Sequence, residues 1–340
     1  MAMMHYVGLD VHRNRTSMEV LDGNGKSLLR KEVVGDWAKV ITEVEALPRP
    51  LAVCYEASCG YGYLHGRLSK VSDRVEVAHP GHLRLIFRSK KKNDRVDAAK
   101  LAKLLYLDEV PQVYVPGLDV RQWRGLIEFR RRMLDKRTAA KNQLRAILRS
   151  NNVRPSKGLW TKKGQAWLAA LKEDALPSMQ LLQRDLLVEE LEGLAKKVAR
   201  VEAELAKIAA SHPAVTVLMT IPGVGIRTAE AFVAYVADAA RFRRSLRAGT
   251  YFGLVPCQDA SGGKERLGHI TREGPPTVRK LLCEAAWQAV RRSPKVKKWF
   301  ERISGGEAGQ RKIALVAVAR KLAVVMLAMM KSGEVWREAD

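Results

Sequence analysis

Apolar and polar residues alternate along the first part of the chain, and this limits what it can fold into more than any other feature. The alternation runs from residue 5 to 35, through HYVGLDVHR and TSMEVLDGNGKSLLRKEVV. A period of two is typical of β-strands, and DGNG supplies the turn residues of a hairpin. Helical and continuously apolar segments then follow in turn: DWAKVITEVEAL, LAVCYEA, GYLHGRLSKV and RVEVAHP. Paired strands followed by strands that alternate with helices predict an α/β domain on a mixed sheet.

Four carboxylates fall at particular points of this pattern. Asp10 lies late in the first strand and Glu56 ends the LAVCYE strand, while Asp94 and Asp97 begin a helix in SKKKNDRVDAAKLAKLL. Acids in the first turn of a helix also act as caps that the macrodipole favours. Like charges about 4 Å apart cost roughly 4 kcal/mol at an effective dielectric near 20, so a cluster of four is tolerable only with bound cations. Mg²⁺ prefers such ligands, and two ions would clamp the attacking and leaving oxygens of a phosphoryl transfer.

The charge balance indicates a polyanionic partner. The chain has 60 Lys+Arg against 36 Asp+Glu, a net charge of +24, which favours nucleic acid first and an anionic membrane second. The most apolar tract, IALVAVARKLAVVMLAMM, is interrupted by Arg320 and Lys321, so no segment is expected to span a membrane. The start MAMMHYVGLD lacks the pattern of an export signal, which predicts a cytoplasmic protein. The four cysteines are scattered without the spacing of a zinc site.

A strongly basic segment follows between residues 121 and 163, where apolar residues recur at helical spacing. We expect an amphipathic helix whose basic face tracks phosphates of DNA or folded RNA. Its candidate contacts are Arg130, Arg131, Arg132, Lys141 and Arg145. A heptad seam comes next, formed by Leu187, Leu191, Leu194, Val198, Val201, Leu205 and Ile208. The seam predicts either a helical hairpin within the chain or a dimer contact, and the sequence favours neither.

Two glycine-rich segments mark the C-terminal part. IPGVG precedes a helix and resembles a helix-hairpin-helix turn, in which Gly223 and Gly225 would let the backbone approach a phosphate. A simple turn between helices has the same letters. Ser261 precedes Gly262, Gly263 and Lys264, which predicts a hydroxyl exposed on a flexible loop, although Ser-Gly-Gly is usually only a turn.

Seven motifs in order carry a resemblance to a known family. They are YVGLDVHR, CYEASCGYG, KNDRVDAAKLAKLL, IPGVGIRTA, YFGLVP, SGGKERLGHITREG and VRKLLCEAAW. Together, over residues 4–300, they resemble the insertion-sequence transposases with an Asp-Glu-Asp-Asp tetrad, a family that also contains the Piv-type DNA invertases. The resemblance implies an α/β N-terminal RuvC-like, RNase H-type nuclease domain (4–118), a basic helix and coiled-coil segment (119–213) and a mainly α C-terminal transposase domain (214–335).

The resemblance also implies the roles of single residues. Asp10, Glu56, Asp94 and Asp97 would hold two Mg²⁺ ions, for which Mn²⁺ can substitute. Ser261 would become covalently joined to DNA, and the active site would be composite, with the tetrad of one subunit meeting Ser261 of another in a homodimer or homotetramer. Lys90, Lys91, Lys92 and Lys264 would face the nucleic acid backbone.

The resemblance further implies partners beyond DNA. A structured non-coding bridge RNA would pair with target and donor DNA, the basic helix would help to hold it, and the heptad segment would join protomers. A serine hydroxyl needs a base or a metal to activate it, and a phosphoserine conserves the energy of the broken bond, so no ATP is expected. Two rivals remain: a metal-dependent DNA invertase or junction resolvase that acts without guide RNA, and a basic architectural protein with no catalytic activity.

Overall fold

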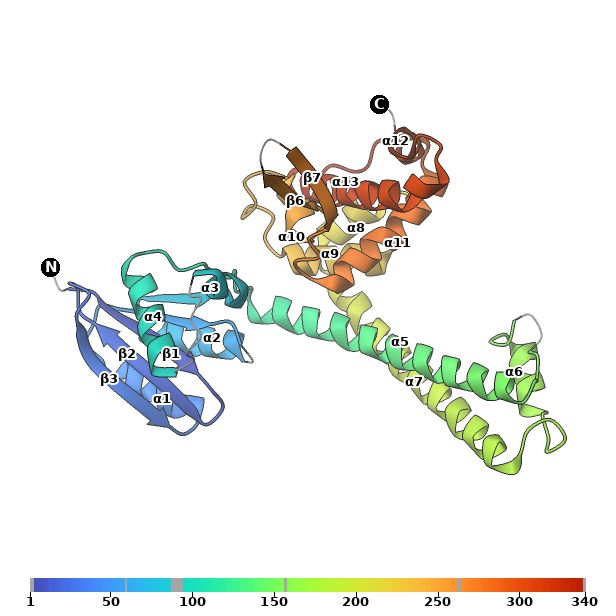
Figure 1. The fold of residues 1–340 in the computed structure, drawn as a ribbon, viewed down its shortest axis with the longest axis horizontal. Helices are drawn as coiled ribbons and strands as arrows, with labels where there is room; N and C mark the ends of the chain where they lie inside the picture. The colour runs from blue at the N-terminus through green and yellow to red at the C-terminus, as the bar shows by residue number, and fades with distance from the viewer. Residues whose placement is uncertain (1–2, 59, 87–93, 156–157, 262–263, 339–340) are drawn as a thin grey trace. The chain divides into compact units, whose positions relative to one another are not determined.

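The computed structural model of the chain describes residues 3–58, 60–86, 94–155, 158–261 and 264–338. It divides into two compact units, Met1–Arg121 and Gln122–Asp340. Figure 1 shows their elements, and each unit is considered by itself.

The first unit is built on a five-stranded mixed sheet in the order β3-β2-β1-β4-β5. Its strands are β1 (His5–Val11), β2 (Arg15–Leu21), β3 (Ser27–Val34), β4 (Leu51–Glu56) and β5 (Arg74–Ala78). The first three strands pair antiparallel, whereas β4 lies parallel to both β1 and β5. Asp22 closes the DGNG turn by accepting hydrogen bonds of 2.9 Å from the backbone N–H groups of Asn24 and Lys26. The prediction of an α/β domain on a mixed sheet is confirmed.

Helices cover both faces of this sheet. They are α1 (Trp37–Glu45), α2 (Tyr61–Val71), α3 (Pro80–Ile86) and α4 (Asp94–Tyr106). One core joins α1 and α2 to the sheet through Leu9 and Tyr55, and a second core joins α4 to the opposite face through Cys54 and Leu101. The alternation of the strands therefore separates a face covered by α1 and α2 from a face covered by α4.

The second unit contains a long helical hairpin. Its helices are α5 (Leu118–Ser150), which begins just before the boundary between the units, α6 (Lys162–Ala169) and α7 (Ser178–Ala210). Met133 of α5 packs against Leu194 and Val198 of α7, and another cluster lies at the tip, with Leu144 and Leu148 at its centre. Figure 1 shows α5 and α7 running in opposite directions. The heptad seam thus packs within the chain, as the hairpin interpretation predicts.

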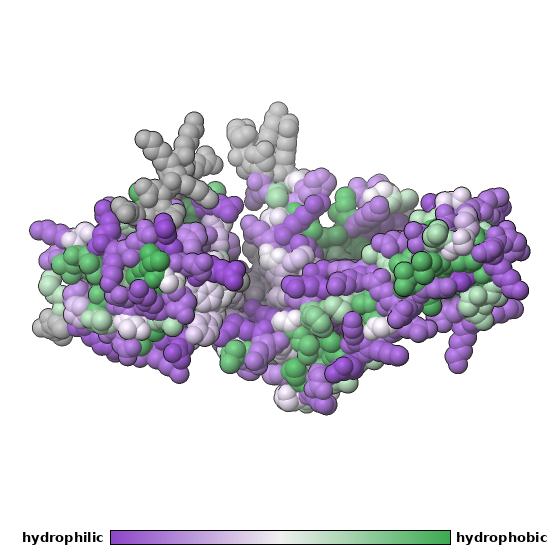
Figure 2. Space-filling model, turned by 90° about the horizontal axis from the view of Figure 1, so that it is seen from below, coloured by the Kyte–Doolittle hydropathy of each residue, from purple (hydrophilic) through white to green (hydrophobic). Residues whose placement is uncertain are grey.

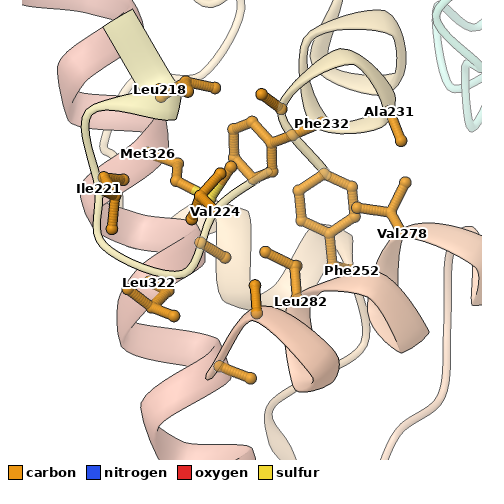
Figure 3. Packing of buried hydrophobic residues seen from close by; sticks show 14 of the residues in the cluster. Leu218, Ile221, Val224, Ala231, Phe232, Phe252, Val278, Leu282, Leu322 and Met326 are labelled. Atoms are coloured by element: carbon orange, nitrogen blue, oxygen red, sulfur yellow. The ribbon is translucent and has the colours of Figure 1, made fainter. Parts of the chain in front are cut away.

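A mainly helical bundle forms the rest of this unit. Its elements are α8 (Pro213–Met219), α9 (Ile226–Val236), α10 (Arg247–Tyr251), β6 (Pro256–Ser261), β7 (Lys264–Ile270), α11 (Pro276–Arg292), α12 (Pro294–Ser304), η1 (Ala308–Gln310) and α13 (Arg311–Ser332). Figure 3 shows Phe232 and Phe252 near Leu282 in the core of the bundle. The centroids of the two phenylalanine rings are 5.1 Å apart. Trp123 of α5 and Leu205 of α7 belong to the same core, so the base of the hairpin is part of the bundle.

The apolar tract of the sequence is the central helix of the bundle. Among the described residues, Ala308–Ser332 is one helix long and apolar enough to cross a membrane by length and composition alone. Val318, Leu322 and Met326 are fully buried in the core of the bundle, and the helix also carries Arg320 and Lys321. Half of its apolar window is buried inside the protein, so packing in the core of the bundle contributes to its apolar character.

Candidate active site

Asp10 and Glu56 lie at the carboxyl ends of neighbouring parallel strands. The register pairs Gly8 with Cys54 and Leu9 with Tyr55, so Asp10 follows next to Glu56. Side chains alternate along a strand, and therefore Asp10 shares the face of Gly8 and Glu56 shares the face of Cys54. That face is the one covered by α4. The topology of the sheet therefore places Asp10 and Glu56 on the same face at neighbouring strand ends.

The start of α4 is held at the same end of β1. A Cβ added at Gly8 would lie 2.1 Å from the carbonyl oxygen of Ala98 and 2.4 Å from the backbone nitrogen of Ala102, so this glycine lets α4 approach the strand closely. The other end of the helix lies at the start of β1, where the rings of Tyr6 and Tyr106 are 5.4 Å apart. Because α4 runs opposite to β1, its first turn, with Asp97, is directed towards the end of the strand that carries Asp10.

A lysine and a histidine of the same unit lie beside two of these carboxylates. Lys100 donates a hydrogen bond of 2.9 Å to Oδ1 of Asp97. Nε2 of His12 lies 3.5 Å from Oδ2 of Asp10, whose side chain is 17% exposed. Both acids therefore retain access to solvent beside a cationic or polar neighbour.

The carboxylates are of the kind that binds magnesium, but their described side chains do not lie close enough together to form a metal site. Carboxylate oxygens are the ligands that Mg²⁺ prefers. Among the described residues, however, no group of three or more His, Cys, Asp or Glu side chains lies close enough together to hold a metal ion. The side chain of Asp94, the first residue of α4, lies outside the described residues. Asp10, Glu56 and Asp97 thus share one edge of the sheet without forming a ready three-carboxylate group.

Ser261 ends strand β6 in the second unit, where it pairs with Lys264 at the start of β7. The expectation of a flexible loop is wrong for Ser261 itself, because the residues on both sides of Ser-Gly-Gly form an antiparallel hairpin. The side chains from Asp259 to Leu267 lie outside the described residues, as do Lys90, Lys91 and Lys92. The position of the serine hydroxyl and of the Lys264 ammonium group stays a prediction.

The cations of the basic helix α5 differ in whether they pair with acids of the chain. Arg130 pairs with Glu202 of α7, and Arg131 pairs with Glu128 and Asp135 of its own helix. Arg132 is exposed to solvent. Nearer the tip, the ammonium nitrogen of Lys141 lies 4.5 Å and the guanidinium carbon of Arg145 lies 5.4 Å from the centre of the Trp160 ring.

The glycines of the IPGVG turn have different surroundings. Gly223 has a φ of 93°, and a Cβ there would lie 2.5 Å from the backbone nitrogen of Ala289 in α11. This glycine is required by packing inside the bundle. Gly225 caps the start of α9, is exposed, and has open space around its Cβ position. Of the two, Gly225 has the free surroundings that contact with a phosphate needs.

Two further acids were not singled out from the sequence: Glu128, which is half-buried, and Glu230, which is buried. Glu128 accepts hydrogen bonds from Tyr235 and Thr277, as well as from Arg131. Burial alone would raise the pKa of Glu128, but these hydrogen bonds lower it. Glu230 is 1% exposed and burial raises its pKa to about 7, although Arg227 donates a hydrogen bond of 2.9 Å to it. An acid inside the apolar run AEAFVAYV was the available signal for Glu230.

Comparison with known proteins gives the family. The model described as "Transposase IS116/IS110/IS902 family" matches residues 215–301. A second model, described as a transposase and labelled for IS110, matches residues 7–152. Together they match parts of both units. The chain belongs to the IS110 family of transposases.

Similar relatives extend over nearly the whole chain. The transposase for insertion sequence element IS1328 of Yersinia enterocolitica is 26% identical over 82% of each chain. The transposase for IS1111A of Coxiella burnetii is 26% identical over 97% of this chain and 91% of its own length. A probable family 20 transposase of Pseudomonas aeruginosa is 25% identical over 97% of this chain and 98% of its own length. As an IS110-family transposase, the chain is an enzyme that binds, cuts and rejoins DNA.

Proposed function

We propose that this transposase cuts and rejoins DNA with an acidic tetrad and a serine nucleophile. The observation that carries the proposal is the placement of Asp10 and Glu56 at adjacent strand ends, under the first turn of α4, which Gly8 holds close to β1. The sheet order, with an antiparallel β3-β2-β1 part and a parallel β1-β4-β5 part, supports a RuvC-like, RNase H-type fold for this unit.

Asp10, Glu56, Asp94 and Asp97 would hold the metal ions, two Mg²⁺ or Mn²⁺ in their place. Bound ions would supply Lewis-acid stabilisation of charge on the phosphate oxygens. Before binding, the ion pair between Lys100 and Asp97 offsets part of the negative charge. This agrees with the high cost of leaving several carboxylates side by side without a cation.

Ser261 would perform the covalent step. Its Oγ forms a bond to a DNA phosphorus, the bond from that phosphorus to a deoxyribose oxygen breaks, and the proton of the serine hydroxyl ends on the leaving oxygen. In rejoining, a hydroxyl of another DNA end attacks the phosphoserine and restores the serine. One phosphoester replaces another in each step, so no ATP is consumed.

The proposal also includes an RNA partner and further copies of the protein. A structured bridge RNA would pair with target and donor DNA, and the protein would act in the cytoplasm. A homodimer or homotetramer would let the tetrad of one subunit meet Ser261 of another. The hairpin supports self-association, because α7 exposes Met179, Leu182 and Leu186, and Figure 2 shows hydrophobic surface towards the hairpin end of the view.

The decisive experiment compares Ser261→Ala and Asp10→Asn on cognate DNA with Mg²⁺. Both variants should lose strand transfer, and a protein–DNA adduct that survives denaturation should form only when Ser261 is present. Ser178→Ala and Asp174→Asn, at exposed positions in the second unit, are the matched controls and should keep full activity. Persistent cutting by Ser261→Ala would instead support hydrolysis by the tetrad alone, as in a junction resolvase.

The RNA is tested separately. The protein is expressed with its native flanking DNA, purified, and the copurifying RNA is sequenced. One dominant species from the flank is expected. A random sample of cellular RNA would overturn the bridge RNA and favour an invertase that recognises DNA by itself.

A further inference from the structure

The outer half of α5 carries a row of four cations at intervals of four residues: Arg137, Lys141, Arg145 and Arg149. Residues four apart share one face of a helix, about 6 Å apart along its axis. Each step of four residues also turns by about 40°, so the row winds along about 18 Å of the helix and through about 120° of its surface. We call these four residues the hairpin stripe.

The cations of the stripe are not paired with any described acid, unlike those nearer the base of the same helix. Arg130 and Arg131 pair with acids, whereas no member of the stripe forms an ion pair with any acid that the structure describes. Burial and the neighbouring charges of Arg137 and Arg145 lower the pKa of Lys141. Like charges at this spacing destabilise a helix, so the arrangement costs stability in the free protein.

Trp160 fixes the middle of the stripe. Its ring lies under both Lys141 and Arg145 and packs against the hydrophobic cluster at the tip. Stacking of cations on an aromatic face restricts the long side chains while it leaves their polar ends accessible. The central cations are thereby held in place before any partner binds.

We propose that the hairpin stripe is a docking site for the phosphate backbone of duplex DNA. The length of the row, about 18 Å, is comparable to the axial rise of about five base pairs of duplex DNA, 3.4 Å each, so several backbone phosphates come within its reach. DNA is the polyanion that membership of the transposase family establishes as a partner. The inference rests on the nucleic-acid-binding role that the sequence predicts for α5. It keeps Lys141 and Arg145 from the predicted contacts. Arg137 and Arg149 take the place of Arg130 and Arg131, which are already paired within the chain.

The position of the stripe gives it a separate task from cutting. Ile127 belongs to the core of the bundle, and the centre of the stripe lies some sixteen residues farther along α5, about 25 Å away. Contacts made there would hold DNA outside the segment at Ser261 and would add affinity without reading bases. Contacts of this kind position the DNA without reading its sequence. Each neutralised phosphate makes the dependence of the binding constant on salt steeper, and this dependence can be measured.

The test uses the full-length double variant Arg137→Gln/Arg149→Gln, which leaves Lys141, Arg145 and Trp160 intact. Binding to a random-sequence duplex of about 30 base pairs is measured between 50 and 200 mM salt. Two lost phosphate contacts should lower the slope of log K against log salt by about 1.8, so that the salt-induced loss of affinity over this range shrinks about tenfold. The matched control, Lys196→Gln/Lys197→Gln on α7, removes the same charge at exposed positions and should keep the wild-type slope.

Three results would overturn the proposal. An unchanged slope would show that Arg137 and Arg149 do not contact phosphates. An equal change of slope in the α7 control would show that the effect comes from the net charge of the protein and not from the stripe. A change seen only with a folded RNA probe, and not with the duplex, would make RNA the partner. Arg137→Lys/Arg149→Lys should restore the slope. Because Asp10→Asn is expected to bind like wild type, the outcome is independent of whether the proposed cutting chemistry is right.

Discussion

The Nε atom of Arg130 donates a hydrogen bond of 2.7 Å to Oε1 of Glu202, and so joins the two long helices of the hairpin. A cation from the most basic stretch of the sequence is thus used to hold the protein together. Its side chain is only 20% exposed, which leaves little of it for a phosphate.

Arg130→Gln should therefore act on stability more than on nucleic acid binding. Loss of this partly buried ion pair is expected to lower the free energy of unfolding by about 1 kcal/mol and to leave the salt dependence of DNA binding almost unchanged. Arg132→Gln, at an exposed position two residues away, serves as the comparison. It should leave the free energy of unfolding unchanged and reduce the salt dependence of DNA binding. Urea unfolding together with binding titrations separates the two effects, and a large change in salt slope for Arg130→Gln would contradict the assignment.

Gly8→Ala should displace α4. The new Cβ would meet backbone atoms of Ala98 and Ala102, which cannot rotate away, so the helix must shift. A loss of about 1–3 kcal/mol in the free energy of unfolding is expected, together with loss of strand cleavage, since Asp97 moves relative to Asp10.

The matched control for this change is Gly66→Ala. Gly66 lies inside α2 and has open space around its Cβ position. Alanine there should stabilise the protein by about 0.5–1 kcal/mol and leave cleavage intact. Thermal unfolding of both variants measures the contrast, and equal Tm values would show that α4 does not depend on Gly8.

Glu230 should make stability depend on pH. Its pKa of about 7 in the folded protein exceeds the ordinary value of 4.5, so the folded state binds the extra proton between these values. Stability is then lost as pH rises from about 4.5 to 7, by roughly 3 kcal/mol in total. Glu230→Gln cannot lose that proton, and its stability relative to wild type should rise by about 2.5 kcal/mol between pH 5 and pH 8. The free energy of unfolding is measured in urea as a function of pH. If wild type and Glu230→Gln changed in parallel, or if the exposed Glu189→Gln gained the same stability, Glu230 would not be the source of the pH dependence.

Arg137→Gln should weaken DNA binding and yet stabilise the free protein. Removing the like-charge pair of Arg137 and Lys141 is expected to add about 0.2–0.5 kcal/mol to the free energy of unfolding. The readout is a Tm that rises by about 1 °C while the affinity for duplex DNA falls. A Tm below that of wild type would indicate that Arg137 has a structural role.

The sequence determined the local elements and the positions of the acids along them. Alternating apolar residues and DGNG are enough to place β2 and β3, and the end of an apolar run is enough to place Glu56, because these patterns depend only on neighbours in the chain. Seven motifs in order were enough for the family. The strand at Ser261 was missed, since Ser-Gly-Gly reads equally as a loop and as the turn of a hairpin.

Tertiary structure alone decided which charges have partners. Arg130 and Arg145 look alike in the sequence, but Glu202, far along the chain, reaches the first, and Trp160 underlies the second. Glu230 is likewise an ordinary helix residue until the bundle closes around it and raises its pKa. These differences depend on the register in which α5, α7 and α9 pack, and charge interactions act through space, so no local pattern in the sequence encodes them.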